Sequence, residues 1–292
     1  MSIFTGSGVA LVTPFKDGQV DFESLGSLLD WHVEKKTDAI VICGTSGEAS
    51  TLKDDEHLET IDYTVKRINK RIPVIAGVGS NSTEHAVDFS KETEKMGADA
   101  LLHVTPYYNK ATKRGLIQHY TVISESTKLP IILYSVPSRT GVNITPEICG
   151  ELAELENIKA IKEASGNIAQ VAEIARVTPD DFDIYSGNDD MVVPLLSLGG
   201  KGVISVVANV APTDTHNMVI RYLKGDVKGA MKMQLDMKNL IDALFIEVNP
   251  IPAKAGLWLM GKCEYEYKLP LCRMEEKNLE ILKNAMKDYG II

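Results

Sequence analysis

Paired-cysteine motifs, metal-binding motifs and long apolar runs are all missing from this 292-residue sequence. Its four cysteines show no C-x-x-C spacing and its six histidines form no H-E-x-x-H pattern, so a structural zinc site is not expected. No apolar run approaches the ~20 residues that a membrane-spanning helix needs. Residues 1–15 contain no basic side chain and lack the charged start of a signal peptide. These features predict a cytoplasmic protein with reduced cysteines.

Positive charge is also in short supply. The 31 basic and 40 acidic side chains give a net charge of −9, which argues against nucleic acid or an anionic membrane as the main partner. A small anionic substrate stays possible, because a local basic pocket can oppose the overall field. The hydrophobic content of 44% is ordinary for a globular protein, and the length suits one large domain or two small ones.

Short apolar runs typical of buried strands recur along the first two thirds of the chain. Several are apolar nearly throughout, as expected for strands that are covered on both faces. Helical patterns separate them, and eight strands alternating with helices predict a (β/α)8 TIM barrel. A doubly wound open sheet is the alternative, but it would need a glycine-rich phosphate loop after its first strand. The expected strands are 8–13, 39–43, 73–77, 100–104, 131–135, 158–162, 183–187 and 202–206.

The helices between these strands carry recognisable start signals. The segment 21–36 places its leucines on one stripe, as in an amphipathic helix. Asp54 is expected to cap the next helix, and Asn81 followed by Glu84 resembles a capping box. Pro212 suits the first turn of a later helix.

The strand pattern stops after about residue 225. The segments 226–248, 251–260 and 275–289 have the pattern of helices, and Asn249-Pro250 separates the first from the second. No linker rich in serine and glycine precedes them. The sequence therefore predicts a catalytic barrel at 1–225 and a C-terminal helical appendage at 226–292, packed on that barrel.

Polar clusters follow five of the predicted strands. In barrels of this kind, the active groups come from the C-terminal ends of the strands and from the loops that follow them. Residues far apart in the sequence would therefore meet at one rim. The clusters are 44–48, 105–109, 134–141, Lys162 and 186–190.

Lys162 is the residue most suited to chemistry, since it ends a short buried strand before a glycine turn. Loss of water disfavours the charged ammonium form of such an amine. A neutral amine can attack a carbonyl group and form a Schiff base. Taken alone, the position also suits a lysine that only extends its amine out of the strand end.

Three neighbouring clusters allow both a functional and a purely structural interpretation. The turn Gly44-Thr45-Ser46-Gly47 offers backbone N–H groups and hydroxyls that can hold an anion, or it is simply a turn. Tyr134 can move a proton beside the pocket, or be a core tyrosine. Arg139 can grip a carboxylate, or be a solvated loop arginine. Asn188 or Asp189 is expected to cap the following helix, with no catalytic role.

Four strings in this order, 44–48, 105–109, 134–141 and 161–166, make the chain resemble the pyruvate-dependent class I aldolases. Within that superfamily, the resemblance is greatest to the dihydrodipicolinate synthase family, and it spans nearly the whole chain. It implies the condensation of pyruvate with L-aspartate 4-semialdehyde for lysine and diaminopimelate biosynthesis. It also implies that no metal or organic cofactor takes part.

The resemblance implies a role for each of four reacting residues. Lys162 would form the imine with pyruvate. Thr45, Tyr108 and Tyr134 would form a proton relay, with Tyr134 nearest to the imine. Tyr108 would come from the neighbouring subunit, so that the enzyme would be a homo-oligomer, a tetramer built from tight dimers.

It also implies a set of substrate-binding residues. Ser46, where the family usually has threonine, would hold the carboxylate of pyruvate. Arg139 would bind the carboxylate of the semialdehyde. The backbones of Gly187 and Ile204 would shape the pocket.

Many members of the family have a lysine feedback site at a subunit interface. His57, Asn81 and Tyr107 match its usual pattern in this sequence. Asp54 and His85 depart from that pattern, because inhibited members tend to have histidine and glutamate at these positions. The loss of a carboxylate at position 85 removes a partner for the ammonium group of the effector, so weak or absent inhibition by lysine is expected.

Two alternatives differ in function. A sister aldolase, such as N-acetylneuraminate lyase or a keto-deoxy-sugar-acid aldolase, would share the barrel, the lysine and the tyrosine after strand five. Arg139 argues against it, because a sugar pocket needs groups that recognise hydroxyls rather than a cation aimed at a second carboxylate. A non-catalytic ligand-binding barrel would lack the lysine or a relay residue, and the sequence contains all of them.

Overall fold

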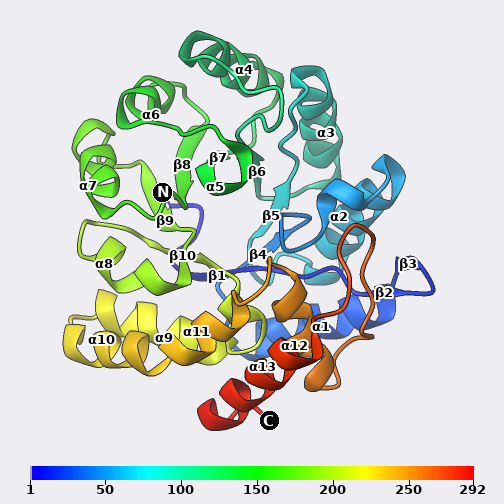
Figure 1. The fold of residues 1–292 in the computed structure, drawn as a ribbon. Helices are drawn as coiled ribbons and strands as arrows, with labels where there is room; N and C mark the ends of the chain where they lie inside the picture. Colours follow the sequence, from blue (N-terminus) through cyan, green and yellow to red (C-terminus); the bar gives the residue numbers. More distant parts are fainter. Residues whose placement is uncertain (1) are drawn as a thin grey trace.

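The computed structural model describes residues 2–292 and contains, within them, a closed barrel of eight parallel strands (Figure 1). Each strand pairs with its neighbours in chain order, and β1 closes the barrel between β10 and β4. This confirms the TIM-barrel prediction. The strands are β1 (Gly6–Ala10), β4 (Ala39–Ile42), β5 (Val74–Gly77), β6 (Ala100–Val104), β7 (Ile131–Ser135), β8 (Ile158–Glu163), β9 (Asp183–Ser186) and β10 (Gly202–Ser205).

A ring of helices surrounds the barrel, as Figure 1 shows. A small antiparallel hairpin, β2 (Phe15–Lys16) and β3 (Gln19–Val20), precedes the first helix, and the short α5 (Pro137–Thr140) lies in the connection after β7. No helix within residues 2–292 is long and apolar enough to cross a membrane. The surrounding helices are α1 (Phe22–Glu34), α2 (Asp54–Ile68), α3 (Thr83–Met96), α4 (Lys113–Ser126), α6 (Pro146–Ala153), α7 (Ile168–Val177), α8 (Val192–Leu196) and α9 (Pro212–Leu223).

The strands are rich in apolar residues because both of their faces are buried. Side chains alternate between the two faces of a strand. On β8, Ala160 packs inside the barrel with Tyr134, whereas Ile161 packs outward against the core beneath the helices. The same alternation directs Lys162 to the inside, where its strand position pairs with that of Tyr134 on β7.

The start of α3 differs from the prediction. The hydroxyl of Ser82 accepts the backbone N–H of His85 at 3.4 Å, so the cap is Ser82 rather than Asn81 with Glu84. The side-chain amide of Asn81 is used elsewhere, because its Nδ2 donates to the carbonyl oxygen of Tyr107 at 3.2 Å. Asn81 and Ser82 are adjacent and both suit a cap. The contact of Asn81 with Tyr107 leaves Ser82 to cap the helix.

The other predicted helix starts lie within one residue of the observed ones. Asp54 is the first residue of α2 rather than its cap, and Lys53 takes the cap position. Pro212 occupies the first turn of α9, as predicted. Asp21 caps α1 by accepting the N–H of Ser24 at 3.1 Å.

The segment 226–248 is not a single helix, as had been expected. It forms α10 (Val227–Asp236) and α11 (Lys238–Leu244), which are separated at the buried residue Met237. The helix α10 packs along α9, while apolar side chains of α11 belong to the core shared with the residues after β10. Local periodicity does not reveal such a break, because both halves remain helical.

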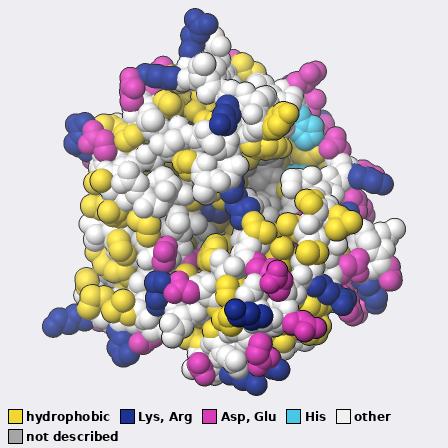
Figure 2. All heavy atoms as spheres, in the orientation of Figure 1, with side chains coloured by type: hydrophobic (Ala, Val, Ile, Leu, Met, Phe, Trp, Pro, Cys, Tyr) yellow, Lys and Arg dark blue, Asp and Glu magenta, His cyan; other side chains and the backbone are white. Residues whose placement is uncertain are grey.

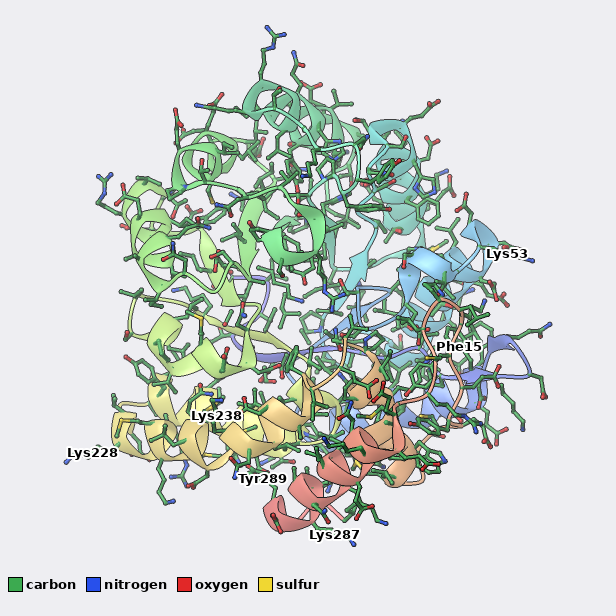
Figure 3. All side chains as sticks on the ribbon, in the orientation of Figure 1. Phe15, Lys53, Lys228, Lys238, Lys287 and Tyr289 are labelled. Atoms are coloured by element: carbon green, nitrogen blue, oxygen red, sulfur yellow. The ribbon has the colours of Figure 1, made fainter. Side chains whose placement is uncertain are left out.

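The last helices, α12 (Ile251–Leu259) and α13 (Glu276–Tyr289), complete this C-terminal group. One apolar core joins Val206 and Val210, which follow β10, to Leu244 and Leu257. Charged side chains such as Lys228 and Lys287 extend outward from these helices (Figure 3). The shared core agrees with an appendage packed on the barrel, and its boundary at residue 226 stays a prediction.

Candidate active site

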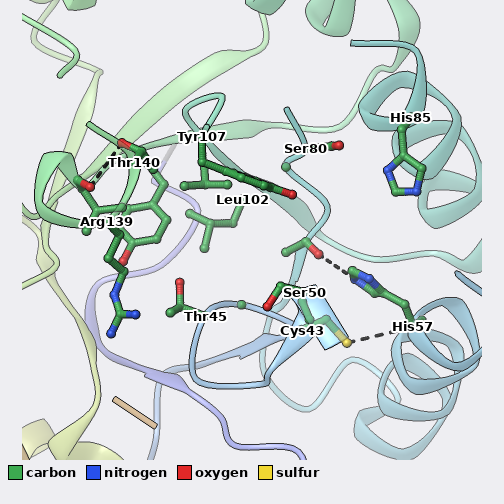
Figure 4. A pocket seen from close by; sticks show the side chains of 17 residues that line it. Cys43, Thr45, Ser50, His57, Ser80, His85, Leu102, Tyr107, Arg139 and Thr140 are labelled. Carbon is green, nitrogen blue, oxygen red and sulfur yellow. Dashed lines mark hydrogen bonds between the residues drawn. The ribbon is translucent and has the colours of Figure 1, made fainter. Parts of the chain in front are cut away.

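A cavity of about 290 Å³ opens beyond the C-terminal ends of the strands β4 to β7. Figure 2 shows a hollow near the centre of the viewed face, with basic side chains inside it. Thr45, Tyr134 and Arg139, which come from two of the predicted polar clusters, line the cavity (Figure 4). The strand-end rule therefore brought together residues that are up to 94 positions apart in sequence, as 139 minus 45 gives.

Lys162 lies beside this cavity rather than in its lining. Its side chain is 5% exposed, and its Nζ lies 4.3 Å from the centre of the Tyr134 ring. Gly187 leaves the room that the lysine stem occupies, because a Cβ atom there would lie 3.2 Å from Cε of Lys162. The amine is thus kept from bulk water at the mouth end of β8, beside an aromatic ring that lines the cavity.

Asn188 and Asp189 follow β9 and were the two candidates for the cap of the next helix. Asn188 takes the cap position of the short 3-10 helix Asp189–Met191, without a side-chain hydrogen bond. Asp189 is a buried carboxylate that accepts the hydroxyl of Ser205 and the backbone N–H groups of Val206 and Val207, at 2.9 and 3.2 Å. Burial raises the pKa of Asp189, while these hydrogen bonds act in the opposite direction. Asp189 therefore fixes the turn after β10.

The turn after β4 carries the predicted anion-binding group. Ser46 is buried, and its hydroxyl lies 3.0 Å from Nδ2 of Asn249. Gly47 is required by close packing, because a Cβ atom there would lie 3.1 Å from the backbone of Cys43. Thr13 holds the turn by donating its hydroxyl to the carbonyl oxygen of Gly47 at 2.7 Å.

Arg139 extends from α5 on the same side of the cavity as Thr45 (Figure 4). Its Nη2 donates to the backbone oxygen of Asn249 at 3.0 Å. Asn249 therefore contacts two of the predicted substrate-binding residues, although no motif in the sequence singled it out. The Asn249-Pro250 pair was interpreted only as a helix break.

The remaining candidate site residues do not all lie at the cavity. Tyr107 lines the cavity, and Ile204 is buried inside the barrel with Tyr134. Tyr108 is 92% exposed on the loop after β6, and its φ of 69° lies in the left-handed region that is unfavourable for a tyrosine. Within this subunit, Tyr108 is thus not brought into the buried site around Lys162.

Of the residues proposed for effector binding, His57 and Tyr107 line the cavity, whereas Asn81 does not. Nε2 of His57 donates to the carbonyl oxygen of Gly77 at 2.8 Å, and burial lowers the pKa of His57 to about 4. His85 lines the same cavity, and its Nε2 lies 3.2 Å from Oδ1 of Asp54. Position 54 thus supplies a carboxylate that position 85 lacks, but it is paired with His85.

Nothing in the described part of the chain resembles a metal centre, since no three His, Cys, Asp or Glu side chains in residues 2–292 are placed to share an ion. The candidate chemistry in this pocket is that of an amine, a phenol, hydroxyls and a guanidinium.

Known proteins match this chain over nearly its full length. The sequence model of the Dihydrodipicolinate synthetase family matches residues 3–289. The 4-hydroxy-tetrahydrodipicolinate synthase of Caldicellulosiruptor bescii is 60% identical over 292 residues, covering 100% of this chain and 99% of the relative. A monomeric dihydrodipicolinate synthase variant superposes with a TM-score of 0.98 at 44% identity, covering 99% of this chain and 98% of the variant. The enzyme of Cyanidioschyzon merolae, solved with lysine bound, gives a TM-score of 0.97 at 39% identity and full coverage of both chains.

Proposed function

The chain belongs to the dihydrodipicolinate synthetase family, and we propose that Lys162 carries out its reaction by forming a Schiff base with pyruvate. The chain condenses pyruvate with L-aspartate 4-semialdehyde to give 4-hydroxy-tetrahydrodipicolinate, the activity for which relatives of 57% and 60% identity are named. This activity is favoured over that of the sister aldolases. One observation carries the proposal for Lys162: its amine is buried at the barrel mouth, 4.3 Å from the ring centre of Tyr134.

The first half-reaction would proceed on pyruvate alone. The uncharged Nζ of Lys162 attacks the keto carbon, and loss of water from the carbinolamine leaves an iminium ion. Loss of a methyl proton then gives an enamine, with the nitrogen acting as the electron sink. The hydroxyls of Tyr134 and Thr45, which line the adjoining cavity, are the groups suited to move the protons of these steps.

The second half-reaction would join the two substrates. The enamine carbon attacks the aldehyde carbon of L-aspartate 4-semialdehyde, whose oxygen takes up a proton. The amine of that substrate then attacks the imine carbon and displaces Nζ of Lys162, which closes the six-membered ring and frees the enzyme. Arg139 is suited to hold the carboxylate of the semialdehyde, because a guanidinium can donate two parallel hydrogen bonds.

The carboxylate of pyruvate would be held at the turn after β4. Ser46 offers a buried hydroxyl there, together with the backbone N–H groups of a tight turn. The backbones of Gly187 and Ile204 would bound the opposite side. Serine keeps the hydroxyl of the threonine that is usual in the family.

The exposed Tyr108 supports the proposal of an oligomer. A tyrosine that is 92% exposed in one subunit, on a loop held in a left-handed conformation, is suited to enter a neighbouring subunit. We propose a homotetramer built from tight dimers, in which Tyr108 completes the relay of its partner. The buried free thiols of Cys43 and Cys149 suit a reducing, cytoplasmic location.

Trapping with borohydride tests the central step. Reduction in the presence of pyruvate should attach the three-carbon adduct covalently to Lys162, where peptide mass spectrometry will find it. Lys159 is the matched control, because it lies three residues earlier on the same strand with a more exposed side chain. A label on Lys159, or no label at all, would defeat the proposed mechanism.

A further inference from the structure

Asn249 is the point at which the C-terminal group contacts two residues of the proposed site. It follows α11 and precedes α12, it is 6% exposed, and it contacts two segments that are distant in sequence. Its side chain meets Ser46, 203 residues earlier, and its backbone oxygen meets Arg139, 110 residues earlier. A single residue therefore touches both groups proposed above to hold substrate carboxylates.

The contact with Ser46 has a direction. Nδ2 of Asn249 lies 3.0 Å from the serine Oγ, whereas its Oδ1 lies 3.4 Å from the same atom. The serine hydroxyl therefore accepts from Nδ2 and can donate in return to Oδ1 over a longer and weaker contact. A substrate carboxylate can take the hydroxyl proton in place of Oδ1, while Ser46 goes on accepting from Nδ2. A carboxylate has only acceptor oxygens, so a free hydroxyl proton is what it requires.

We propose that Asn249 is a positioning residue, whose side-chain amide turns the hydroxyl proton of Ser46 toward the carboxylate of pyruvate. The inference rests on the proposed function, because it takes the turn after β4 as the pyruvate carboxylate site. Asn249 does not touch the reacting atoms; it acts through Ser46.

Asn249 contacts Arg139 through its backbone rather than through its side chain. Nη2 of Arg139 donates to the backbone oxygen of Asn249, which every amino acid would supply at this position. The other N–H groups of the guanidinium remain able to bind a carboxylate. Substituting the side chain of Asn249 should therefore affect pyruvate and spare the semialdehyde.

Two further contacts fix the helix that follows Asn249. The hydroxyl of Tyr267 donates to the backbone oxygen of Ile251 at 2.8 Å, which fixes the first turn of α12. Lys254 on the same helix forms a fully buried ion pair with Glu48, two residues after Ser46. Two contacts thus join the turn after β4 to the segment around the start of α12: Lys254 with Glu48, and Asn249 with Ser46. Together they hold the amide of Asn249 next to the serine hydroxyl.

The test is the steady-state kinetics of Asn249→Ala with each substrate varied in turn. Loss of the orienting hydrogen bond should raise the KM for pyruvate roughly tenfold. The KM for the semialdehyde should change less than about twofold, because the backbone oxygen remains. Asn249→Asp, which keeps the size of the side chain, should raise the KM for pyruvate roughly a hundredfold, since its carboxylate accepts the hydrogen bond of the Ser46 hydroxyl and repels the substrate.

Combining substitutions of Ser46 and Asn249 distinguishes a positioning role of Asn249 from a general effect on the structure. The double variant Ser46→Ala/Asn249→Ala should have the same KM for pyruvate as Ser46→Ala, because the amide acts only through that hydroxyl. Asn157→Ala is the matched control: Nδ2 of Asn157 donates to backbone carbonyl oxygens, including that of Thr127 at 2.9 Å, and its loss should leave both KM values unchanged.

An equal rise of both KM values in Asn249→Ala, or independent effects of the two substitutions on the KM for pyruvate, would overturn the inference. Borohydride trapping at saturating pyruvate distinguishes this failure from failure of the proposed function. Wild-type protein and Asn249→Ala should both carry the adduct on Lys162. Without a label on the wild type the Schiff-base mechanism itself fails, whatever the kinetics of the variant.

Discussion

Replacing Lys254 by an uncharged residue should lower the free energy of unfolding more than the loss of any exposed ion pair would. Lys254 and Glu48 form an ion pair in which both side chains are completely buried. Nζ of Lys254 also donates to the backbone oxygen of Glu266 at 3.1 Å and lies 4.1 Å from the centre of the Phe15 ring. Burial lowers the pKa of Lys254, and Glu48 opposes this effect. Figure 3 labels Phe15 near the C-terminal segment.

The substitution Lys254→Met keeps the length of the stem and leaves the carboxylate of Glu48 buried without its cation. Breaking a buried pair in this way costs about 3–5 kcal/mol. Glu48→Gln should also destabilise, because it leaves the ammonium buried without a counter-charge. In the double variant neither charge is left unpaired, and the amide oxygen can still accept the backbone N–H of Lys268, as Glu48 does at 3.2 Å. Its loss of stability should therefore fall at least about 2 kcal/mol below the sum of the single losses.

Urea unfolding followed by circular dichroism measures these differences, at one fixed protein concentration because association would shift the midpoint. Lys66→Met is the control: its partner Asp62 lies one helical turn away and the lysine is 73% exposed, so the change should stay within about 0.5 kcal/mol. A loss below about 1 kcal/mol for Lys254→Met, or additive single losses, would refute the argument that burial makes this pair costly to break.

Two further predictions concern lysine and pH. L-Lysine should inhibit weakly or not at all in a steady-state assay, because the carboxylate of Asp54 is paired with His85 rather than free for an ammonium group; micromolar inhibition would contradict this. Stability should fall as the pH drops below about 6.5, the ordinary pKa of histidine, because burial lowers the pKa of His32 and of His103 to about 3. The unfolded chain then binds protons that the folded chain does not, at up to about 1.4 kcal/mol per pH unit for each histidine. Urea midpoints at pH 7 and pH 5 measure the loss, and His103→Gln should reduce it; an unchanged loss would contradict the assignment to His103.

The barrel was predictable because its strands are buried on both faces. Two of them, Ala100–Val104 and Ile131–Ser135, begin and end where the sequence predicted. The first strand was placed two to three residues late, because Leu11 and Val12 continue the apolar run beyond the end of β1 at Ala10. Composition marks a buried segment more reliably than it marks the last backbone pairing.

The site was predictable only where the topology decides the position. The strand-end rule brought Thr45, Tyr134 and Arg139 to one cavity, since Tyr134 lies near the end of β7 and the other two lie in the connections after β4 and β7. Asn188 takes the cap position that was predicted for it or Asp189, whereas the hydrogen-bond partners of Asp189 lie at the end of the next strand and after it. Asn249 was missed because its contacts with Ser46 and Arg139 join segments 203 and 110 residues apart, which no local pattern reveals.

The contacts between the C-terminal helices and the turn after β4 can form only late in the synthesis of the chain. Asn249 and Lys254 lie 203 and 206 positions after their partners, so all eight barrel strands leave the ribosome before either contact can form. Domains generally fold from the N-terminal side as they emerge. A nascent barrel would therefore contain Lys162, the proposed nucleophile, before it gains Asn249, the proposed positioning residue. On these two proposals, the pyruvate site would be complete only after residue 249 has left the ribosome.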